Sequence, residues 1–309
     1  MISNNIETYL KSVNENQLKN NDLLFSSFSF NSFNVDKVDY LYAHKTSKIS
    51  MIFGVRGDKL SAPFTAPFGF IRYGSQDLKL KQVEEFYNAL VEEINESPDI
   101  SSASITLPAF FYNSSMITKN SLALSKAGFK LAYRDINSHI EINDHSISSL
   151  GSSTKKSIRV SSKYQNDFIK AESESEKELA YIIIKQNRES KGYPLRMTWK
   201  QVQSTSNNVA NCDFFYTKTE NENSAAAIVF HINNETVQVV YWGANEHGER
   251  HNAMYFLPFE IIEYYRSLGF KYIDVGPSSE QGKVSQGLND FKQMIGCQNT
   301  FKESWVYEK

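Results

Sequence analysis

Cysteine is scarce in this sequence, and its placement fits neither a metal nor a redox motif. Cys212 and Cys297 are the only cysteines among 309 residues, and they lie far apart in the chain. A CxxC pair, which is typical of zinc ligands and redox dithiols, does not occur. The sequence therefore favours free thiols in a reducing compartment over a disulfide framework.

Long apolar runs and an excess of positive charge are also absent. No segment approaches the roughly 20 apolar residues of a membrane span, and residues 1–16 lack the apolar core of a signal peptide. With 33 basic and 35 acidic residues the formal net charge is −2, which argues against a DNA-binding surface. We predict a cytoplasmic protein with no transmembrane segment and no DNA partner.

Several nucleotide and nucleophile motifs are missing as well. Neither Gly-x-Gly-x-x-Gly nor Gly-x-Ser-x-Gly occurs, so dinucleotide-dependent hydride transfer and α/β-hydrolase chemistry lose support. Residues 276–285 approach a P-loop, but five residues instead of four separate Gly276 from Gly282, and Val284 follows Lys283 where a hydroxyl residue is needed. We expect a mobile loop that faces substrate instead.

A pair of histidines does not predict a metal site. His247 and His251 are four residues apart, but the acid between them does not follow the first histidine directly, as it does in zinc-binding helices. Gly248 between them indicates a loop. This loop enters a helix at Asn252 or Ala253, where free N–H groups would suit an anion; a solvated loop with a helix cap is the alternative.

The chain is long enough for two domains of about 150 residues each. A Ser- and Lys-rich stretch at 146–162 marks the boundary, and we predict domains 1–150 and 151–309. The triplet Gly-Phe-Lys occurs at both 128–130 and 269–271, each time as a helix stop. Strands grouped as a meander, followed by helix, strand, helix and strand, are expected in both halves. The fold class is therefore α/β (α+β), with one unit duplicated.

The expected elements follow from the hydrophobic spacing. An N-terminal helix would carry Ile6, Leu10 and Val13. Further helices are expected at 80–94, 121–127, 176–189, 199–202 and 253–268, and strands at 38–43, 49–55, 105–107, 129–133, 139–142, 168–169, 212–217, 225–232, 236–242 and 272–275.

One acid interrupts an apolar strand near the end of the chain. Asp274 lies within residues 272–275, and a buried carboxylate without partners is costly. It must therefore be hydrogen-bonded or face a cleft, and both a structural and a chemical role remain open. Lys292 follows on a helix whose inner face we expect to be Leu288, Phe291 and Ile295.

These segments resemble a known family. Gly-Phe-Lys-Tyr-Ile-Asp-Val-Gly at 269–276, then Gly-Leu-x-x-Phe-Lys-x-x-Ile-Gly at 287–296, are similar to the C-terminal half of FemAB-like and BioF2-like acetyltransferases of the GNAT superfamily. Residues 61–69 resemble a Pro- and Gly-bearing loop of their first half. Residues 153–160 resemble their basic inter-domain helix, and Asn187-Arg188 with 191–194 resemble their helix-to-loop turn.

The resemblance implies two tandem GNAT-like domains, each a mixed, mostly antiparallel sheet flanked by helices, with the donor site in the second domain. It also implies transfer of an acyl or aminoacyl group to an amine. Family members use acyl-CoA with amino sugars and other small amines, or aminoacyl-tRNA with cell-wall peptides. Residues 245–251 stand where the family has its pyrophosphate loop, but they carry only Gly248, whereas the usual motif is Gln or Arg, x-x, then Gly-x-Gly or Gly-x-Ala.

We predict an acyl-CoA-dependent N-acyltransferase without a metal, acting on an amine such as an amino sugar in surface polysaccharide biosynthesis. One alternative is an aminoacyl-tRNA-dependent peptidyltransferase, although no long heptad arm for tRNA occurs. The other is a binding protein that kept the fold and lost the chemistry. The predicted residues are Asp274, Ser278 and Tyr272 for catalysis, Tyr241, Trp242, Gly243, His251 and Asn252 for the donor, and Lys292, Phe68 and Arg188 for substrate.

Overall fold

A computed structural model describes residues 23–74, 77–193 and 195–309, so the helix predicted around Ile6 lies outside the described residues. The chain divides into two compact units. Unit 1 consists of Met1–Ile136, Ser279–Lys283 and Thr300–Lys309, and unit 2 consists of Asn137–Ser278 and Val284–Asn299. The sequence predicts one boundary at residue 150, whereas these units interleave along the chain.

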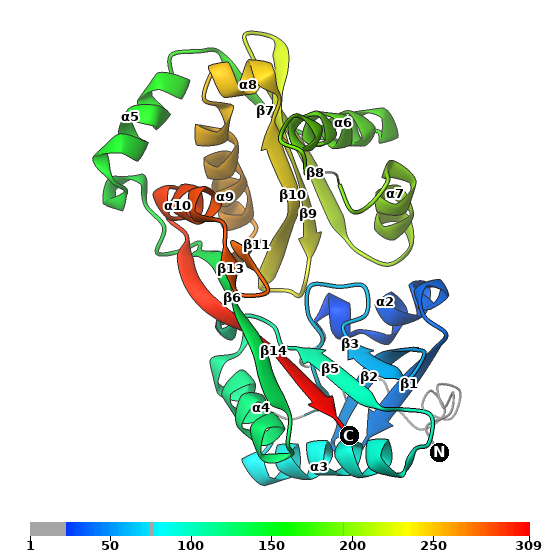
Figure 1. Ribbon diagram of the computed structural model, residues 1–309. Helices are drawn as coiled ribbons and strands as arrows, with labels where there is room; N and C mark the ends of the chain where they lie inside the picture. The colour runs from blue at the N-terminus through cyan, green and yellow to red at the C-terminus, as the bar shows by residue number, and fades with distance from the viewer. Residues whose placement is uncertain (1–22, 75–76, 194) are drawn as a thin grey trace. The chain divides into compact units, whose positions relative to one another are not determined.

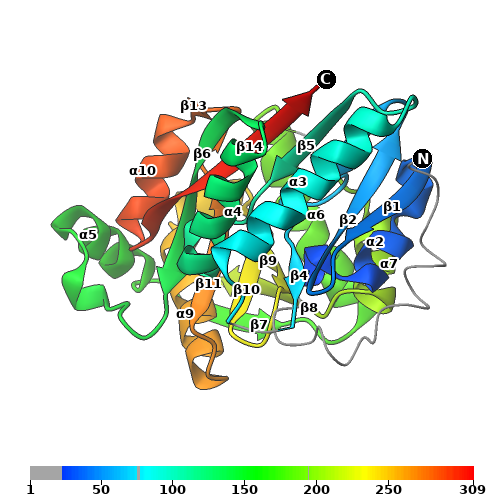
Figure 2. The same cartoon turned by 90° about the horizontal axis from the view of Figure 1, so that it is seen from below.

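Unit 1 contains a mixed sheet with the strand order β1-β2-β3-β5-β14-β6, and β4 pairs with β2. Helices α3 and α4 lie side by side in this unit (Figures 1 and 2). The bounds are β1 Tyr40–Lys45, β2 Ile49–Arg56, β3 Lys59–Ala62, β4 Arg72–Tyr73, β5 Ser102–Thr106, β6 Lys130–Glu141, β14 Gln298–Glu308, α2 Phe28–Phe33, α3 Leu80–Glu96 and α4 Ser114–Lys126.

Unit 2 contains the strand order β6-β11-β10-β9-β8-β7. Figure 1 shows α6 and α7 on one side of this sheet and α9 and α10 on the other. The bounds are β7 Asn166–Lys170, β8 Cys212–Thr219, β9 Glu222–His231, β10 Thr236–Ala244, β11 Tyr272–Pro277, α5 Ser152–Ser161, α6 Glu174–Ser190, α7 Trp199–Asn208, α8 Glu246–Arg250, α9 Leu257–Ser267 and α10 Gln286–Met294.

One strand plan occurs in both units. In unit 1 the antiparallel strands β1, β2 and β3 are followed by β5, which pairs with β3 in parallel. In unit 2 the antiparallel strands β8, β9 and β10 are followed by β11, which pairs with β10 in parallel. Helices α4 and α9 both end just before a glycine with positive φ, Gly128 and Gly269. The predicted fold class, two units with mixed and mostly antiparallel sheets flanked by helices, is confirmed.

The buried face of α6 differs from the predicted one. Ile182, expected to point inward, is 41% exposed, and the buried residues are Ala180, Tyr181, Ile183, Ile184 and Asn187. These positions form a stripe with helical spacing, and α6 packs on β9 and β10. The small Ala180 and the polar Asn187 belong to that stripe, and neither stands out in a hydrophobicity pattern.

A buried carboxylate joins β8 to its neighbours. Asp213 accepts hydrogen bonds from Tyr265 Oη at 2.8 Å and His231 Nε2 at 2.7 Å, and Lys170 Nζ lies 2.8 Å away. Burial opposes the charge on Asp213, but the hydrogen bonds from His231, Lys170 and Tyr265 outweigh it and lower the pKa to about 2. The ionised form of Asp213 therefore stabilises unit 2.

We expect Asp213→Asn to lower the free energy of unfolding at pH 7 by about 1–2 kcal/mol, allowing for solvent screening of the partly exposed pair. Because the folded pKa is depressed, the wild type has this stability above the ordinary pKa of 3.8 and loses it as the pH falls toward 2. Urea unfolding of both proteins at pH 7 and below pH 4 measures the difference in their free energies of unfolding, which should become smaller at the lower pH. Asp167→Asn, an exposed change on β7, is the control; equal losses in both variants would contradict the role of Asp213.

Candidate active site

Strands β10 and β11 separate after a short parallel pairing. They pair only through residues 236–238 and 272–274, and β10 then continues to Ala244 without β11 beside it. The pairing of β10 with β9 shifts register between Val239 and Tyr241, which marks a β-bulge. The two strands therefore form a fork, and no described strand pairs with the fork-facing edge of residues 239–244.

The predicted residues Tyr241, Trp242 and Gly243 all lie on the open part of this fork. Their side chains alternate between the two faces of the sheet. The Trp242 ring lies 6.1 Å from the ring of Phe291 on α10. Gly243 faces α6, where a Cβ atom would lie 2.4 Å from Asn187 Oδ1. Only glycine allows this close approach, which fixes the end of α6 against β10.

Asp274 lies at the apex of the fork and is 1% exposed. Its Oδ1 accepts hydrogen bonds from Asn137 Nδ2 at 2.7 Å and Gly276 N at 2.8 Å, and its Oδ2 accepts one from Gln238 Nε2 at 2.7 Å. These partners come from β6, β10 and β11 itself. The carboxylate thus has the partners that its burial requires, and it joins three strands where two of them begin to part.

The other two predicted catalytic residues lie at opposite ends of β11. Tyr272 begins the strand, and its ring is 6.3 Å from the ring of His139. Ser278 follows the strand, is 1% exposed, and lies 3.3 Å from Ser138 through the two hydroxyl oxygens. At about 3.3 Å per residue, roughly 20 Å of strand separates Tyr272 from Ser278. The structure therefore does not bring these two residues together.

Sequence reasoning missed the polar residues that surround Asp274. Asn137, His139 and Gln238 are all buried, and His139 is the residue opposite Asp274 in the β6–β11 pairing. Burial lowers the pKa of His139 to about 4, against the opposing charge of Asp274, so the imidazole is neutral at pH 7. The only sign of these buried residues in the sequence is that single polar residues interrupt extended segments.

Lys292 is buried, contrary to the predicted orientation of its helix. The side chain is 2% exposed, whereas Leu288, expected on the inner face, is 39% exposed. Lys292 Nζ donates to Gly276 O at 2.8 Å and to Pro277 O at 2.9 Å. The ammonium group thereby fixes the end of β11, where carbonyl groups would otherwise lack donors.

Residues 276–285, which we predicted as a mobile loop that faces substrate, form a short hairpin. Its strands are β12 Ser279–Glu280 and β13 Lys283–Val284. Asp135 Oδ1 accepts hydrogen bonds from Ser279 Oγ at 2.7 Å and from Gly282 N at 3.0 Å. The backbone donors of the turn are thus partly used by the protein's own carboxylate, which disfavours a phosphate there.

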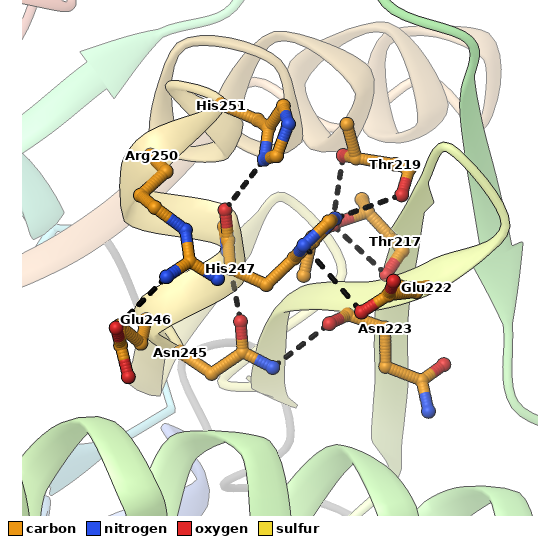
Figure 3. Close-up of polar contacts among 11 residues, drawn as sticks. Thr217, Thr219, Glu222, Asn223, Asn245, Glu246, His247, Arg250 and His251 are labelled. Carbon is orange, nitrogen blue, oxygen red and sulfur yellow. Dashed lines mark hydrogen bonds and ion pairs between the residues drawn. The ribbon is translucent and has the colours of Figure 1, made fainter.

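Residues 246–250 form helix α8, which corrects the expected loop at His247 and His251 (Figure 3). Asn245 Oδ1 caps the helix by accepting from Gly248 N at 2.9 Å, and His247 Nε2 lies 2.9 Å from Thr219 O. A Cβ atom on Gly248 would lie 2.0 Å from Ser224 O. Glycine is present here because the helix packs directly on the β8–β9 hairpin, not because the chain turns.

The first turn of α8 is acidic. Glu246 pairs with Arg250 and Glu249 pairs with Lys191, each at 2.9 Å. Side chains of this helix and of α6 line a polar cavity of about 640 Å³. Two carboxylates at the positive end of a helix repel a phosphate, so these residues do not fit the pyrophosphate of coenzyme A in the way that the family motif does.

His251 and Asn252 follow α8 and are engaged within the chain. The ring of His251 lies 4.6 Å from Tyr164 and 4.3 Å from His247, and its Nδ1 is 2.8 Å from His247 O. Asn252 has a φ of 56°, and its side chain does not cap the 3₁₀ turn Ala253–Tyr255 that follows. The predicted helix at 253–268 thus begins as this turn and continues as α9.

Arg188 and Phe68, both predicted to bind substrate, differ in environment. Phe68 belongs to the core of unit 1, is 1% exposed, and packs against Phe25 and Tyr112 with ring centroids 5.2 and 5.1 Å away. Arg188 lies in the last turn of α6 in unit 2. Its Nε is buried and has no hydrogen-bond partner, and a buried donor in this state costs about 1–3 kcal/mol.

Metal and membrane features can be judged for the part of the chain that the structure describes. There, no three His, Cys, Asp or Glu side chains gather as ligands for a metal ion. Within the same residues, no helix combines the length and the apolar character needed to cross a membrane.

Burial raises the pKa of Cys297 to about 12, so this thiol near Lys292 is protonated at neutral pH.

Comparison with known proteins identifies the fold. No family model and no curated protein matches the sequence. Solved structures do match: FemX has 13% sequence identity and a TM-score of 0.65, and the match covers 100% of this chain and 96% of FemX. The C-terminal domain (DUF2156) of a putative lysylphosphatidylglycerol synthetase from Agrobacterium fabrum has 10% identity and a TM-score of 0.59, with 94% and 90% covered.

A tandem GNAT protein from the clavulanic acid biosynthesis pathway is also similar, with 8% identity, a TM-score of 0.50, and 87% of this chain and 82% of that chain covered. Identities this low concern the fold and not the reaction. The chain therefore has a GNAT-like fold of the tandem, Fem type. The expected resemblance is confirmed at this level, and its BioF2-like part stays a prediction.

The close contact at Gly248 gives a test of the α8 geometry. We expect Gly248→Ala to lower the free energy of unfolding by at least about 2 kcal/mol, because the added methyl group meets the backbone of Ser224. Gly287→Ala on α10 is the matched control, because its Cβ meets open space. Replacing glycine by alanine in a helix should raise the free energy of unfolding by roughly 0.5–1 kcal/mol. Chemical unfolding of both variants decides, and a Gly248→Ala protein as stable as the wild type would contradict the packing of α8.

Proposed function

We propose that this chain is an N-acyltransferase that moves an acyl group from an activated ester or thioester to an amine. The observation that carries the proposal is the fork between β10 and β11, with its bulge at Val239 to Tyr241. Among the described residues, such a fork leaves the backbone N–H groups on the β11 side of β10 without a strand partner beyond Gln238. Fixed backbone donors stabilise the charge that develops on a carbonyl oxygen during acyl transfer.

The reaction follows from this geometry. The lone pair of a neutral amine attacks the donor carbonyl carbon, and the carbonyl oxygen becomes negative beside the backbone of residues 239–243. When the tetrahedral species collapses, the bond to the carrier breaks, the amine loses a proton to a base, and the carrier thiolate or alkoxide takes up a proton. Tyr241 and Trp242 are proposed to frame the acyl group on either face of the sheet.

For Asp274, the hydrogen bonds favour an anchoring role over direct proton uptake. Donors from Asn137, Gln238 and Gly276 already occupy both of its carboxylate oxygens. We propose that Asp274 positions β10 relative to β11, and that Lys292 does the same for the end of β11. Either Ser278 or Tyr272, which lie at opposite ends of β11, is proposed for proton relay.

The donor is proposed to be an acyl-CoA and the acceptor an amino sugar of a surface glycan, as the family resemblance implies. Glu246 and Glu249 in the first turn of α8 do not suit the pyrophosphate of coenzyme A, so an aminoacyl-tRNA donor, which needs no pyrophosphate site at this helix, is the second candidate. Incubation with acetyl-CoA and a panel of amino sugars, followed by detection of free thiol, tests the first. Incubation with radiolabelled aminoacyl-tRNA and the same amines tests the second.

The two assays also separate enzyme from binding protein. Transfer from one donor identifies that carrier. If neither donor reacts and calorimetry detects no binding of acetyl-CoA or aminoacyl-tRNA, the acyltransferase proposal is wrong, and a binding protein with the same fold remains.

We expect Asp274→Asn to reduce kcat by roughly 100-fold or more and to lower Tm, because an amide nitrogen replaces an acceptor at the apex of the fork. Steady-state kinetics and thermal melts measure the two effects. Asp290→Asn, an exposed change on α10, should alter neither. A normal kcat in a folded Asp274→Asn protein would remove Asp274 from the site.

A further inference from the structure

Arg188 is a cation for which the described residues supply no counter-charge. Its neighbour Asn187 contacts Gly243 and donates from Nδ2 to Ala244 O at 2.6 Å, which ties the last turn of α6 to β10. Within the part of the chain that the structure describes, the buried Nε of Arg188 has no hydrogen-bond partner. Among the described residues, no carboxylate forms an ion pair with its guanidinium. Buried donors in proteins nearly always have acceptors, so this group is suited to a ligand.

Two tyrosines and a second arginine lie near Arg188. Tyr181 Oη donates to Met197 O at 3.1 Å, and the main chain of Met197 also hydrogen-bonds Tyr241. Burial raises the pKa of Tyr241, while the Met197 hydrogen bond and the charges of Arg188 and Arg196 oppose that rise. Arg188 and Arg196 therefore both lie within electrostatic reach of the Tyr241 hydroxyl. Arg196 has interactions of its own, which leaves Arg188 as the cation available to a ligand.

This cluster lies on the α6 face of the bulged part of β10. Tyr241 and Gly243 point to that face, whereas Trp242 points toward α10. A donor carbonyl in the fork would contact the β10 backbone, and an amine approaching it from the α6 side would pass Tyr241. Any group next to that amine would then meet Arg188.

We propose that Arg188, with the hydroxyl of Tyr241, forms a subsite for an anionic group, a carboxylate or a phosphate, carried by the acceptor amine. A guanidinium presents N–H donors in a planar fork that matches both groups. The inference rests on the proposed function, since it names the acceptor class for that reaction: an acidic amine, such as an amino sugar that bears a phosphate or carboxylate, in place of a neutral one.

Binding without any donor tests the subsite directly. Isothermal titration calorimetry measures the affinity for three probes: glucosamine, which has no anionic group, glucosamine 6-phosphate, which has a phosphate, and muramic acid, which has a carboxylate. The wild type should bind the two anionic probes at least 10-fold more tightly than glucosamine. Arg188→Gln should abolish that preference, and Arg188→Lys should keep part of it as a point charge. Lys185→Gln, an exposed change on the same helix, should behave as the wild type.

Thermal melts check that the variants fold. Because Nε of Arg188 has no partner to lose, Arg188→Gln should retain the wild-type Tm. Equal affinity for charged and neutral probes, or an anion preference that survives Arg188→Gln, would overturn the subsite.

The transfer assay separates this inference from the function on which it rests. Arg188-dependent binding of anionic probes without transfer from either donor leaves the subsite standing and removes the acyltransferase proposal. If the enzyme transfers an acyl group to neutral amino sugars and Arg188→Gln does not affect this transfer, the acyltransferase proposal stands and the subsite is wrong. If both hold, Arg188→Gln should raise KM for glucosamine 6-phosphate at least 10-fold with little change in kcat, since the residue binds the substrate away from the reacting atoms.

Discussion

The candidate site depends on one buried carboxylate. Asp274 accepts hydrogen bonds from Asn137, Gln238 and Gly276 at the point where β10 and β11 cease to pair. A charge buried in a sheet is tolerated only when its hydrogen bonds are complete, and completing them requires all three strands in one register. The separation of the two strands beyond that point is therefore a fixed feature, and with it the exposed backbone edge of β10.

The two units use the same strand plan but treat this edge differently. In unit 1, β3 ends at Ala62 because Pro63 has no N–H to donate. The backbone returns at Gly69, whose N–H donates to Thr106 O at 2.9 Å and so covers the edge of β5 with the chain itself. Phe68 is buried beside this contact. Within the described residues, the open fork belongs to unit 2, which explains why a duplicated fold offers one candidate site.

Much of the fold could be predicted from the sequence, and less of the site. Hydrophobic spacing and glycine stops were sufficient for most strands and helices, including β11 with its acid and α10 after it. The errors concern residues whose role comes from distant partners. Lys292 on an amphipathic helix suggests a solvated flank, yet the free carbonyl groups of Gly276 and Pro277 bring it into the interior. Gly248 suggests a turn, yet it lies within helix α8. The residue is glycine because Ser224 O leaves no room for a side chain. Local patterns carry no information about such contacts.

In the proposed reaction, the carbonyl group and the carrier of the acyl group would be recognised by different means, and this explains why the fold does not identify the donor. Backbone N–H groups along β10 depend on strand geometry, so almost any sequence with the bulge can present them. The carrier must be recognised by side chains, and at α8 these are Glu246, Glu249 and the capping Asn245, which already accepts from Gly248 N. A phosphate at this helix would compete with carboxylates for the same donors. A phosphate-bearing carrier therefore has to find its cations elsewhere in unit 2, and the exposed Lys156 and Arg159 on α5 are basic groups for which no carboxylate partner is found in the described chain. The proposed chemistry at the fork therefore does not by itself specify the carrier.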